Sequence, residues 1–156
     1  RSNLGGDLID LEFICSCFLK EETPLFREWY RNGSPVEHTV SYGSAAPTDL
    51  LLVVLVDKWS CSAAEVFTQV MKDYGRGTVV GMHTNGSVRI AKEFEVSDEA
   101  PFVISIGRVT TIKGLDLEGR GVAPDVEVAL SEDDIRAGRD PQLEKAKEIL
   151  LGLMEK

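Results

Sequence analysis

The stretch that decides the fold is residues 51–75, LLVVLVDKWSCSAAEVFTQVMKDYG. It begins with a continuous apolar run, which is typical of a strand covered on both faces in a parallel sheet. A short polar turn follows, and apolar residues then recur at helical spacing from Ser62 until Gly75 ends the pattern. The stretch therefore predicts a buried strand, a sharp turn and an amphipathic helix.

Ser62 lies at the predicted start of that helix, where backbone N–H groups point outward and favour negative charge. A serine in this position can combine a nucleophile with an oxyanion hole. The segment from Ser62 to Glu65 also has the S-x-x-E form of a capping box, in which serine and glutamate satisfy each other's backbone N–H groups. From this stretch alone, a nucleophile and an ordinary helix cap both remain open.

Composition excludes several classes of protein. The 156 residues are 43% hydrophobic and carry a net charge of −9, which fits one soluble domain and argues against nucleic acid as the main partner. No apolar run approaches the roughly 20 residues of a membrane-spanning helix. Cys15, Cys17 and Cys61 match neither a disulfide framework nor a zinc pattern, so we expect buried thiols and no metal or organic cofactor.

The remaining chain alternates predicted strands and helices. Asp7 can cap a helix that follows Gly5 and Gly6, and Asn32-Gly33 is a strong hairpin signal between two strands. The predicted strands cover residues 25–30, 36–42, 50–56, 77–82, 92–96, 101–111 and 125–128. Residues 43–49 read as a small-residue loop, and helices are predicted to start after Ser131 and at Asp140.

The Gly5-Gly6 pair has two interpretations. Glycine permits a positive φ and allows another backbone to come close, so the pair can be a simple joint between a loop and a helix. An exposed N–H at this helix start can also help to bind an anion or an oxyanion. The sequence alone leaves both open.

Several segments in the right order resemble a known family, the tail-specific or C-terminal processing peptidases, which are the S41 serine peptidases. The similarity covers most of the chain and is weakest in the hairpin near residues 24–42. The segments that carry it are RSNLGG (1–6), LVVLVD (52–57), SCSAAE (60–65), DYGR (73–76), VVG (79–81), TNG (84–86), GRGVAPD (119–125) and DPQLEKA (140–146).

The resemblance implies an α/β fold, a ClpP/crotonase-like core of β-β-α units with a central, mostly parallel sheet and flanking helices. It implies that residues 1–156 form a single protease core, with an upstream PDZ domain and the first core strands outside this sequence. It further implies a Ser62 nucleophile, an oxyanion hole made by the N–H groups of Ala63 and Gly6, and protein or peptide substrates. A periplasmic or extracytoplasmic location is also expected from the resemblance alone.

One departure from the family concerns the general base. The family has a lysine in a T-x-G-K-G turn, and the corresponding position here is Ser87. Residues 94–98 support this ungapped register, because they resemble the family's F-x-L-S-D segment. A serine cannot act as that base, and loss of a general base typically removes about 10² to 10⁴ in rate.

Other groups could take part. His83 lies at the same strand end and titrates in a suitable range, although a surface role is the simpler interpretation. Lys92 could turn toward the site but reads as an ordinary solvated lysine. Asp73 matches a polar position of the family and could equally anchor the end of the helix. Cys61 precedes Ser62 by one residue, so its side chain should point elsewhere. A base could also come from outside these residues.

Two hypotheses follow. The first is a serine peptidase of the C-terminal processing class that works through an acyl-enzyme with Ser87 at the usual lysine position. The second is a catalytically inactive relative that binds peptides or serves as an interaction module. The sequence gives no oligomeric state.

Overall fold

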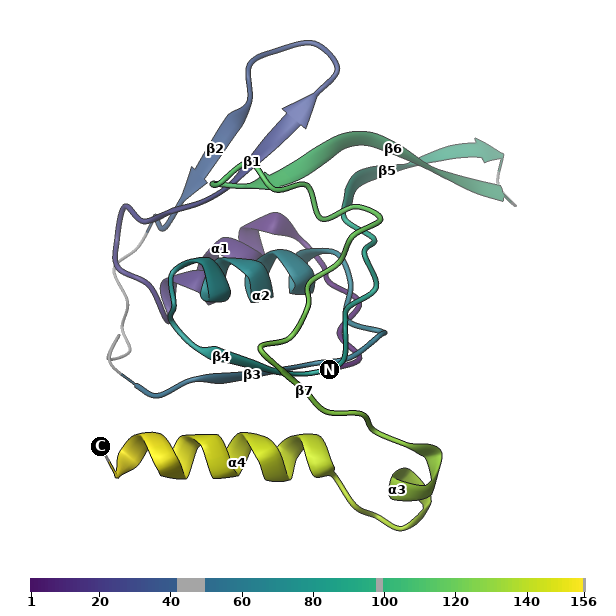
Figure 1. Ribbon diagram of the computed structural model, residues 1–156. Helices are drawn as coiled ribbons and strands as arrows, with labels where there is room; N and C mark the ends of the chain where they lie inside the picture. Colours follow the sequence, from purple (N-terminus) through teal and green to yellow (C-terminus); the bar gives the residue numbers. More distant parts are fainter. Residues whose placement is uncertain (42–49, 98–99, 156) are drawn as a thin grey trace.

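The computed structural model describes residues 1–41, 50–97 and 100–155 (Figure 1). The helices are α1 (Leu8–Ser16), α2 (Ala63–Asp73), α3 (Glu132–Arg136) and α4 (Pro141–Met154). The strands are β1 (Pro24–Tyr30), β2 (Val36–Thr39), β3 (Val53–Val56), β4 (Thr78–Gly81), β5 (Arg89–Ser97), β6 (Ala100–Thr111) and β7 (Val126–Glu127).

These elements stack in layers. One layer is an antiparallel sheet with the strand order β2-β1-β6-β5, and another is a parallel sheet with the order β3-β4-β7. Helices α1 and α2 lie between the two sheets, and α4 covers the outer side of β3 and β4 (Figure 1). Helix α2 is therefore enclosed by a sheet on either side, which explains why so many of its side chains are buried.

The expectation of a mixed α/β fold is confirmed, but that of a mostly parallel central sheet is not. The largest sheet is antiparallel, because β1 of the hairpin pairs with β6 and β6 pairs with β5. The strand, helix, strand unit predicted around residues 51–82 is present. In the sequence β3 precedes α2 and β4 follows it, and the two strands pair in parallel. Among the described residues, parallel pairing is limited to the three short strands β3, β4 and β7.

Element boundaries differ from the predictions in places. The hairpin is present, but β2 ends at Thr39, and the predicted strand end at Tyr42 and the loop at residues 43–49 lie outside the described residues. The apolar run at residues 50–56 yields a strand only from Val53, where pairing with Thr78 begins. Leu50 and Leu51 lie before that pairing and are half exposed.

The core forms where α1 and the hairpin pack on α2. Val66, Val70 and Met71 of α2 are fully buried against Phe26 of β1 and Cys15 of α1. Each such side chain contributes about 1.5–3 kcal/mol by leaving water. Burial also raises the pKa of the Cys15 thiol to about 12, which fits the expected buried thiol, whereas Cys17 and Cys61 are only partly buried, contrary to expectation.

The first residues of the chain join β3 to α4. The Arg1 amino group donates to the Leu55 carbonyl oxygen at 3.0 Å, and its guanidinium binds the Asp140 carboxylate at 2.6 Å. Asp140 in turn caps α4, as predicted, by accepting from the Leu143 N–H at 3.0 Å. The hydrogen bond from Arg1 holds the pKa of Asp140 below its usual value. These contacts hold the N-terminal segment next to the β3–α2 turn.

Candidate active site

Ser62 occupies the turn between β3 and α2 in a backbone conformation that is unusual for a residue with a side chain. Its φ is 57° and its ψ is −129°, whereas a helix N-cap is normally extended. A non-glycine residue in such a sparsely populated region costs about 1–3 kcal/mol, and such residues cluster at functional sites. Local capping alone does not account for this conformation.

The Gly5-Gly6 turn lies directly against Ser62. A Cβ atom added at Gly5 would come within 2.6 Å of the Ser62 Cβ and 2.8 Å of the Ala63 nitrogen, and Gly5 itself has a φ of 88°. Only glycine therefore fits at position 5. Gly6 has open space beside it.

Gly6, Ser62 and Ala63 line one cavity of about 340 Å³. The structure thus brings together the three residues predicted as nucleophile and oxyanion donors. The two N–H groups come from the starts of two different helices, α1 and α2, so both belong to backbone that favours negative charge. Such an arrangement can stabilise an oxyanion that forms at a carbonyl attacked by Ser62.

Glu65 connects the Ser62 turn to a distant loop. Its side chain is completely buried, and one oxygen accepts from the backbone N–H groups of Ser62 and Ser87, each at 3.0 Å. The other oxygen accepts from the Gly86 N–H at 2.7 Å and from the Thr84 hydroxyl. The Glu65 to Ser62 bond of the predicted capping box is present, and the same carboxylate also fixes residues 84–87.

Ser87, the residue predicted at the base position, contacts Ser62 through its backbone. Its carbonyl oxygen accepts from the Ser62 N–H at 2.9 Å, and its hydroxyl donates to the Asn85 side chain. Ser87 is exposed, so this position is open to solvent. It presents a hydroxyl where the resemblance predicts an amine.

The other predicted site residues are not brought to Ser62, and none of them is among the described residues that line its cavity. Asp73 is the last residue of α2, roughly 16 Å along the helix at 1.5 Å per residue, where it contacts Gln69 and Lys113. His83 is exposed, with its Nδ1 at 3.1 Å from the Thr84 carbonyl oxygen. Lys92 is exposed on β5.

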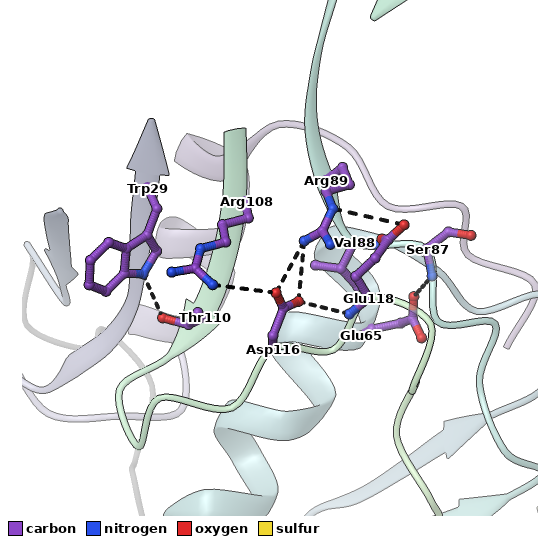
Figure 2. Close-up of polar contacts among 9 residues, drawn as sticks. All are labelled: Trp29, Glu65, Ser87, Val88, Arg89, Arg108, Thr110, Asp116 and Glu118. Carbon is purple, nitrogen blue, oxygen red and sulfur yellow. Dashed lines mark hydrogen bonds and ion pairs between the residues drawn. The ribbon is translucent and has the colours of Figure 1, made fainter. Parts of the chain in front are cut away.

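Carboxylates of the loop before β7 hold the start of β5, next to Ser87. Figure 2 shows Asp116 between Arg89 and Arg108, while Glu118 accepts from the Val88 N–H at 2.7 Å. These two carboxylates were not predicted from the sequence.

Asp57 organises the other side of the Ser62 turn. Its carboxylate accepts from the backbone and hydroxyl of Ser2, from the Ser60 hydroxyl and from the Trp59 N–H. Burial opposes ionisation of this carboxyl, but these donors hold its pKa below the usual value. The Cys61 N–H also donates to the Asn3 carbonyl oxygen at 3.0 Å, so the segment leading to Gly5 is fixed on the turn.

Polar residues of the hairpin line the same cavity and were also missed. Glu28 and Tyr30 of β1 and His38 of β2 line it. Strand alternation could have placed Glu28 and Tyr30 on one face with Phe26, but it does not show that helices α1 and α2 cover one face of this sheet (Figure 1).

Within the described part of the chain, no helix combines the length and the apolar character needed to cross a bilayer.

Comparison with known proteins identifies a family of proteases that this chain resembles. The model of peptidase family S41 matches residues 1–128. The carboxyl-terminal-processing protease of Synechocystis is 30% identical over 155 residues, which are 97% of this chain and 36% of that protein. The chloroplastic C-terminal processing peptidase of Tetradesmus obliquus is 36% identical over 88 residues, which are 56% of this chain and 18% of that protein.

The fold is also similar to that of a solved protease structure. The photosystem II D1 C-terminal processing protease superposes with a TM-score of 0.69 at 27% identity, over 82% of this chain and 33% of that chain. The chain thus spans about a third of the length of the Synechocystis relative. On the family match and these similarities, the chain belongs to peptidase family S41.

Proposed function

We propose that this chain carries the nucleophile of a serine peptidase of the C-terminal processing class. The observation that carries the proposal is the strained Ser62 at the start of α2, packed against Gly5 so closely that no side chain fits there. The family match and the processing proteases among the relatives support peptide bonds as the target. A periplasmic or extracytoplasmic location, as the resemblance implies, belongs to the same proposal.

In the proposed reaction, the Ser62 oxygen forms a bond to the scissile carbonyl carbon. The carbonyl oxygen becomes an oxyanion and accepts from the N–H groups of Ala63 and Gly6. The C–N bond then breaks, and the proton lost by Ser62 leaves with the amine product. Water hydrolyses the acyl-enzyme and regenerates the Ser62 hydroxyl.

The transfer of the Ser62 proton sets the rate in this proposal. His38 lines the cavity, but its ring lies between Glu12 and Glu28, and no hydrogen bond joins it to Ser62 among the described contacts. With Ser87 at the lysine position, we expect water to take the proton and acylation to be slow, about 10² to 10⁴ below a lysine-assisted rate. Ser87→Lys should therefore raise hydrolysis of a C-terminal peptide.

The second candidate is an inactive relative that binds peptides. The observation that favours it is that Ser87, at the predicted base position, meets Ser62 only through its backbone carbonyl oxygen among the described contacts, while its hydroxyl donates to Asn85. In that case the cavity would still hold a peptide, but neither wild type nor Ser87→Lys would cleave it.

A fluorophosphonate probe separates the two candidates, because it reacts with an activated serine and needs no peptide recognition. We expect an adduct on Ser62 by mass spectrometry of the full chain, and none in Ser62→Ala. Ser131, the N-cap of α3, is a serine of the same kind in an ordinary extended conformation and serves as the internal control. No adduct on Ser62, or equal labelling of Ser131, would contradict the proposal.

A further inference from the structure

The cavity beside Ser62 has two chemically different sides. Its walls are mainly apolar, formed by side chains of α1, α2, β5, β6 and the residue before β5, namely Leu8, Val66, Val88, Ile90 and Val109. The polar groups Glu28, Tyr30 and His38 come from the hairpin and contact one another, whereas Gly6 and Ser62 come from the helix starts. A volume of about 340 Å³ lies at the lower end of the range for ligand pockets.

Glu28 is the central group of that polar side. Only 9% of the residue is exposed, although an ionised carboxylate is rarely buried without full compensation. One oxygen accepts from the Tyr30 hydroxyl at 2.6 Å, and this hydrogen bond raises the pKa of Tyr30 to about 12. The other oxygen lies 3.0 Å from His38 Nε2.

His38 leaves one of its ring nitrogens unsatisfied. Its Nδ1 contacts the Glu12 carboxylate, and its ring stacks on Phe26 with centroids 4.5 Å apart, so the imidazole is fixed. Its Nε2 is buried and has no aligned hydrogen-bond partner in the described structure, despite the nearby Glu28 oxygen. A buried polar atom without a partner calls for an explanation, and a missing ligand is one.

Glu12, Glu28 and His38 form a cluster that a cationic hydrogen-bond donor satisfies better than a neutral group does. If Nδ1 donates to Glu12, then Nε2 is an acceptor beside a second acceptor on Glu28, and a donor placed between them relieves both. If the imidazole is protonated, the cluster of Glu12, Glu28 and His38 still carries a net negative charge. Arg89, which also lines the cavity, is already bound to Asp116.

We propose that this cavity binds the substrate side chain at the bond cleaved by Ser62 and selects lysine or arginine, with Glu28 accepting from the cationic end. The apolar walls would pack the methylene groups of such a side chain, as they do wherever long cations bury their stems. This inference rests on the proposed function, because Ser62 fixes which substrate residue enters the cavity.

The test compares two peptidyl phosphonate probes that differ only in the side chain next to the reactive group. One carries lysine and the other norleucine, its neutral analogue. In the wild-type protein, we expect the lysine probe to label Ser62 at least about 30-fold faster, since a desolvated charge pair is commonly worth that much. In Glu28→Gln, the ratio of the two rates should fall to near one.

A ratio of rates is insensitive to partial loss of folded protein, which lowers both rates equally. Glu37→Gln is the matched control, because Glu37 lies on the same hairpin but is exposed and pairs with Arg27. Its ratio should equal that of the wild type. A wild-type ratio near one, or an unchanged ratio in Glu28→Gln, would overturn the inference.

Failure of the proposed function gives a different result. If the simple fluorophosphonate leaves Ser62 unlabelled, the peptidase proposal fails, and the cavity is then tested by equilibrium binding of lysine and norleucine peptides. Preferential binding of the lysine peptide that is lost in Glu28→Gln would support a lysine-selective cavity in a protein that does not cleave peptides. Equal binding of the two peptides would reject the pocket as well.

Discussion

Two helices of this molecule begin with the same sequence signature and differ in almost everything else. Ser131 and Asp134 of α3 form an exposed capping box, in which an extended serine accepts from the Asp134 N–H at 3.1 Å. Ser62 and Glu65 of α2 have the corresponding spacing, but the serine has a positive φ and the glutamate is completely buried. The signature therefore identifies a helix start and does not identify a function.

The difference lies in what surrounds each box. Ser131 and Asp134 contact residues close to them in the sequence, such as Arg139, which donates to Asp134. Glu65 binds a loop twenty residues away, and Ser62 is pressed against Gly5 from the N-terminal segment. Strain that is maintained by distant contacts, and not relieved by local ones, is what distinguishes the candidate nucleophile from the ordinary cap.

The largest expected effect is on catalysis by the two serines. Ser62→Ala should abolish the acyl-enzyme and reduce peptide cleavage to the background rate, because it removes the nucleophile of the proposed reaction. Ser131→Ala should leave cleavage unchanged and cost about 0.5–2 kcal/mol of stability, the usual effect of a lost cap. Peptide hydrolysis and urea denaturation measure the two effects, and residual cleavage by Ser62→Ala would reject the assignment.

Substitutions of the two capping-box carboxylates should change the stability of the protein by different amounts. Glu65→Gln should lower the free energy of unfolding by about 3 kcal/mol or more, because buried backbone donors of the loop lose a charged acceptor. The same variant should also slow labelling of Ser62. Asp134→Asn should leave labelling unchanged and lower the free energy of unfolding far less than Glu65→Gln, since its partners Ser131 and Arg139 are exposed. Similar denaturation midpoints for the two variants would show that Glu65 is no more than a cap.

Two glycines with positive φ give a finer comparison. Gly5→Ala adds both backbone strain and a clash with Ser62, whereas Gly138→Ala after α3 adds strain only, because nothing lies within 4 Å of its new Cβ. We expect Gly5→Ala to slow fluorophosphonate labelling by about 10², in keeping with the cost of displacing a reacting group by an ångström. Gly138→Ala should label at the wild-type rate, and equal rates for both variants would contradict the close approach at Ser62.

The smallest expected effect concerns acid stability near the Ser62 turn. The folded-state pKa of Asp57 is below that of the unfolded chain, about 3.9, so the unfolded state binds a proton first as the pH falls. The stabilisation by Asp57 is therefore complete above that pH and declines toward the lower folded-state pKa.

Asp57→Asn should accordingly show a shallower loss of stability than the wild type as the pH falls below about 4. Urea denaturation at a series of pH values measures the slope. An unchanged slope would mean that the Ser2, Trp59 and Ser60 donors do not matter to the ionised carboxyl.

Local features were predictable from the sequence. The strand, turn and helix around Ser62 follow from one continuous stretch, and the caps at Asp7 and Asp140 follow from their own residues. The approach of Gly6 to Ser62 was expected only through the family resemblance, because the two residues lie 56 positions apart in the sequence (62 − 6).

Features that depend on distant pairing were not predictable. The antiparallel sheet forms because β1 pairs with β6, as in the pairing of Phe26 with Thr111, and no local pattern specifies that partner. The reach of Glu65 to Gly86 and the position of Glu28 in the cavity have the same origin. Glu65 and Glu28 are each a polar residue within an apolar pattern. The sequence shows such a residue but does not reveal which groups form hydrogen bonds with it.

The most direct test of the account is a crystal structure of the protein after reaction with a peptidyl phosphonate. We expect a covalent bond from phosphorus to the Ser62 Oγ, with the phosphoryl oxygen about 2.7–3.1 Å from the backbone nitrogens of both Gly6 and Ala63. An adduct on another residue, or a phosphoryl oxygen directed away from these two N–H groups, would contradict the claim that this turn is built as a nucleophile and its oxyanion hole.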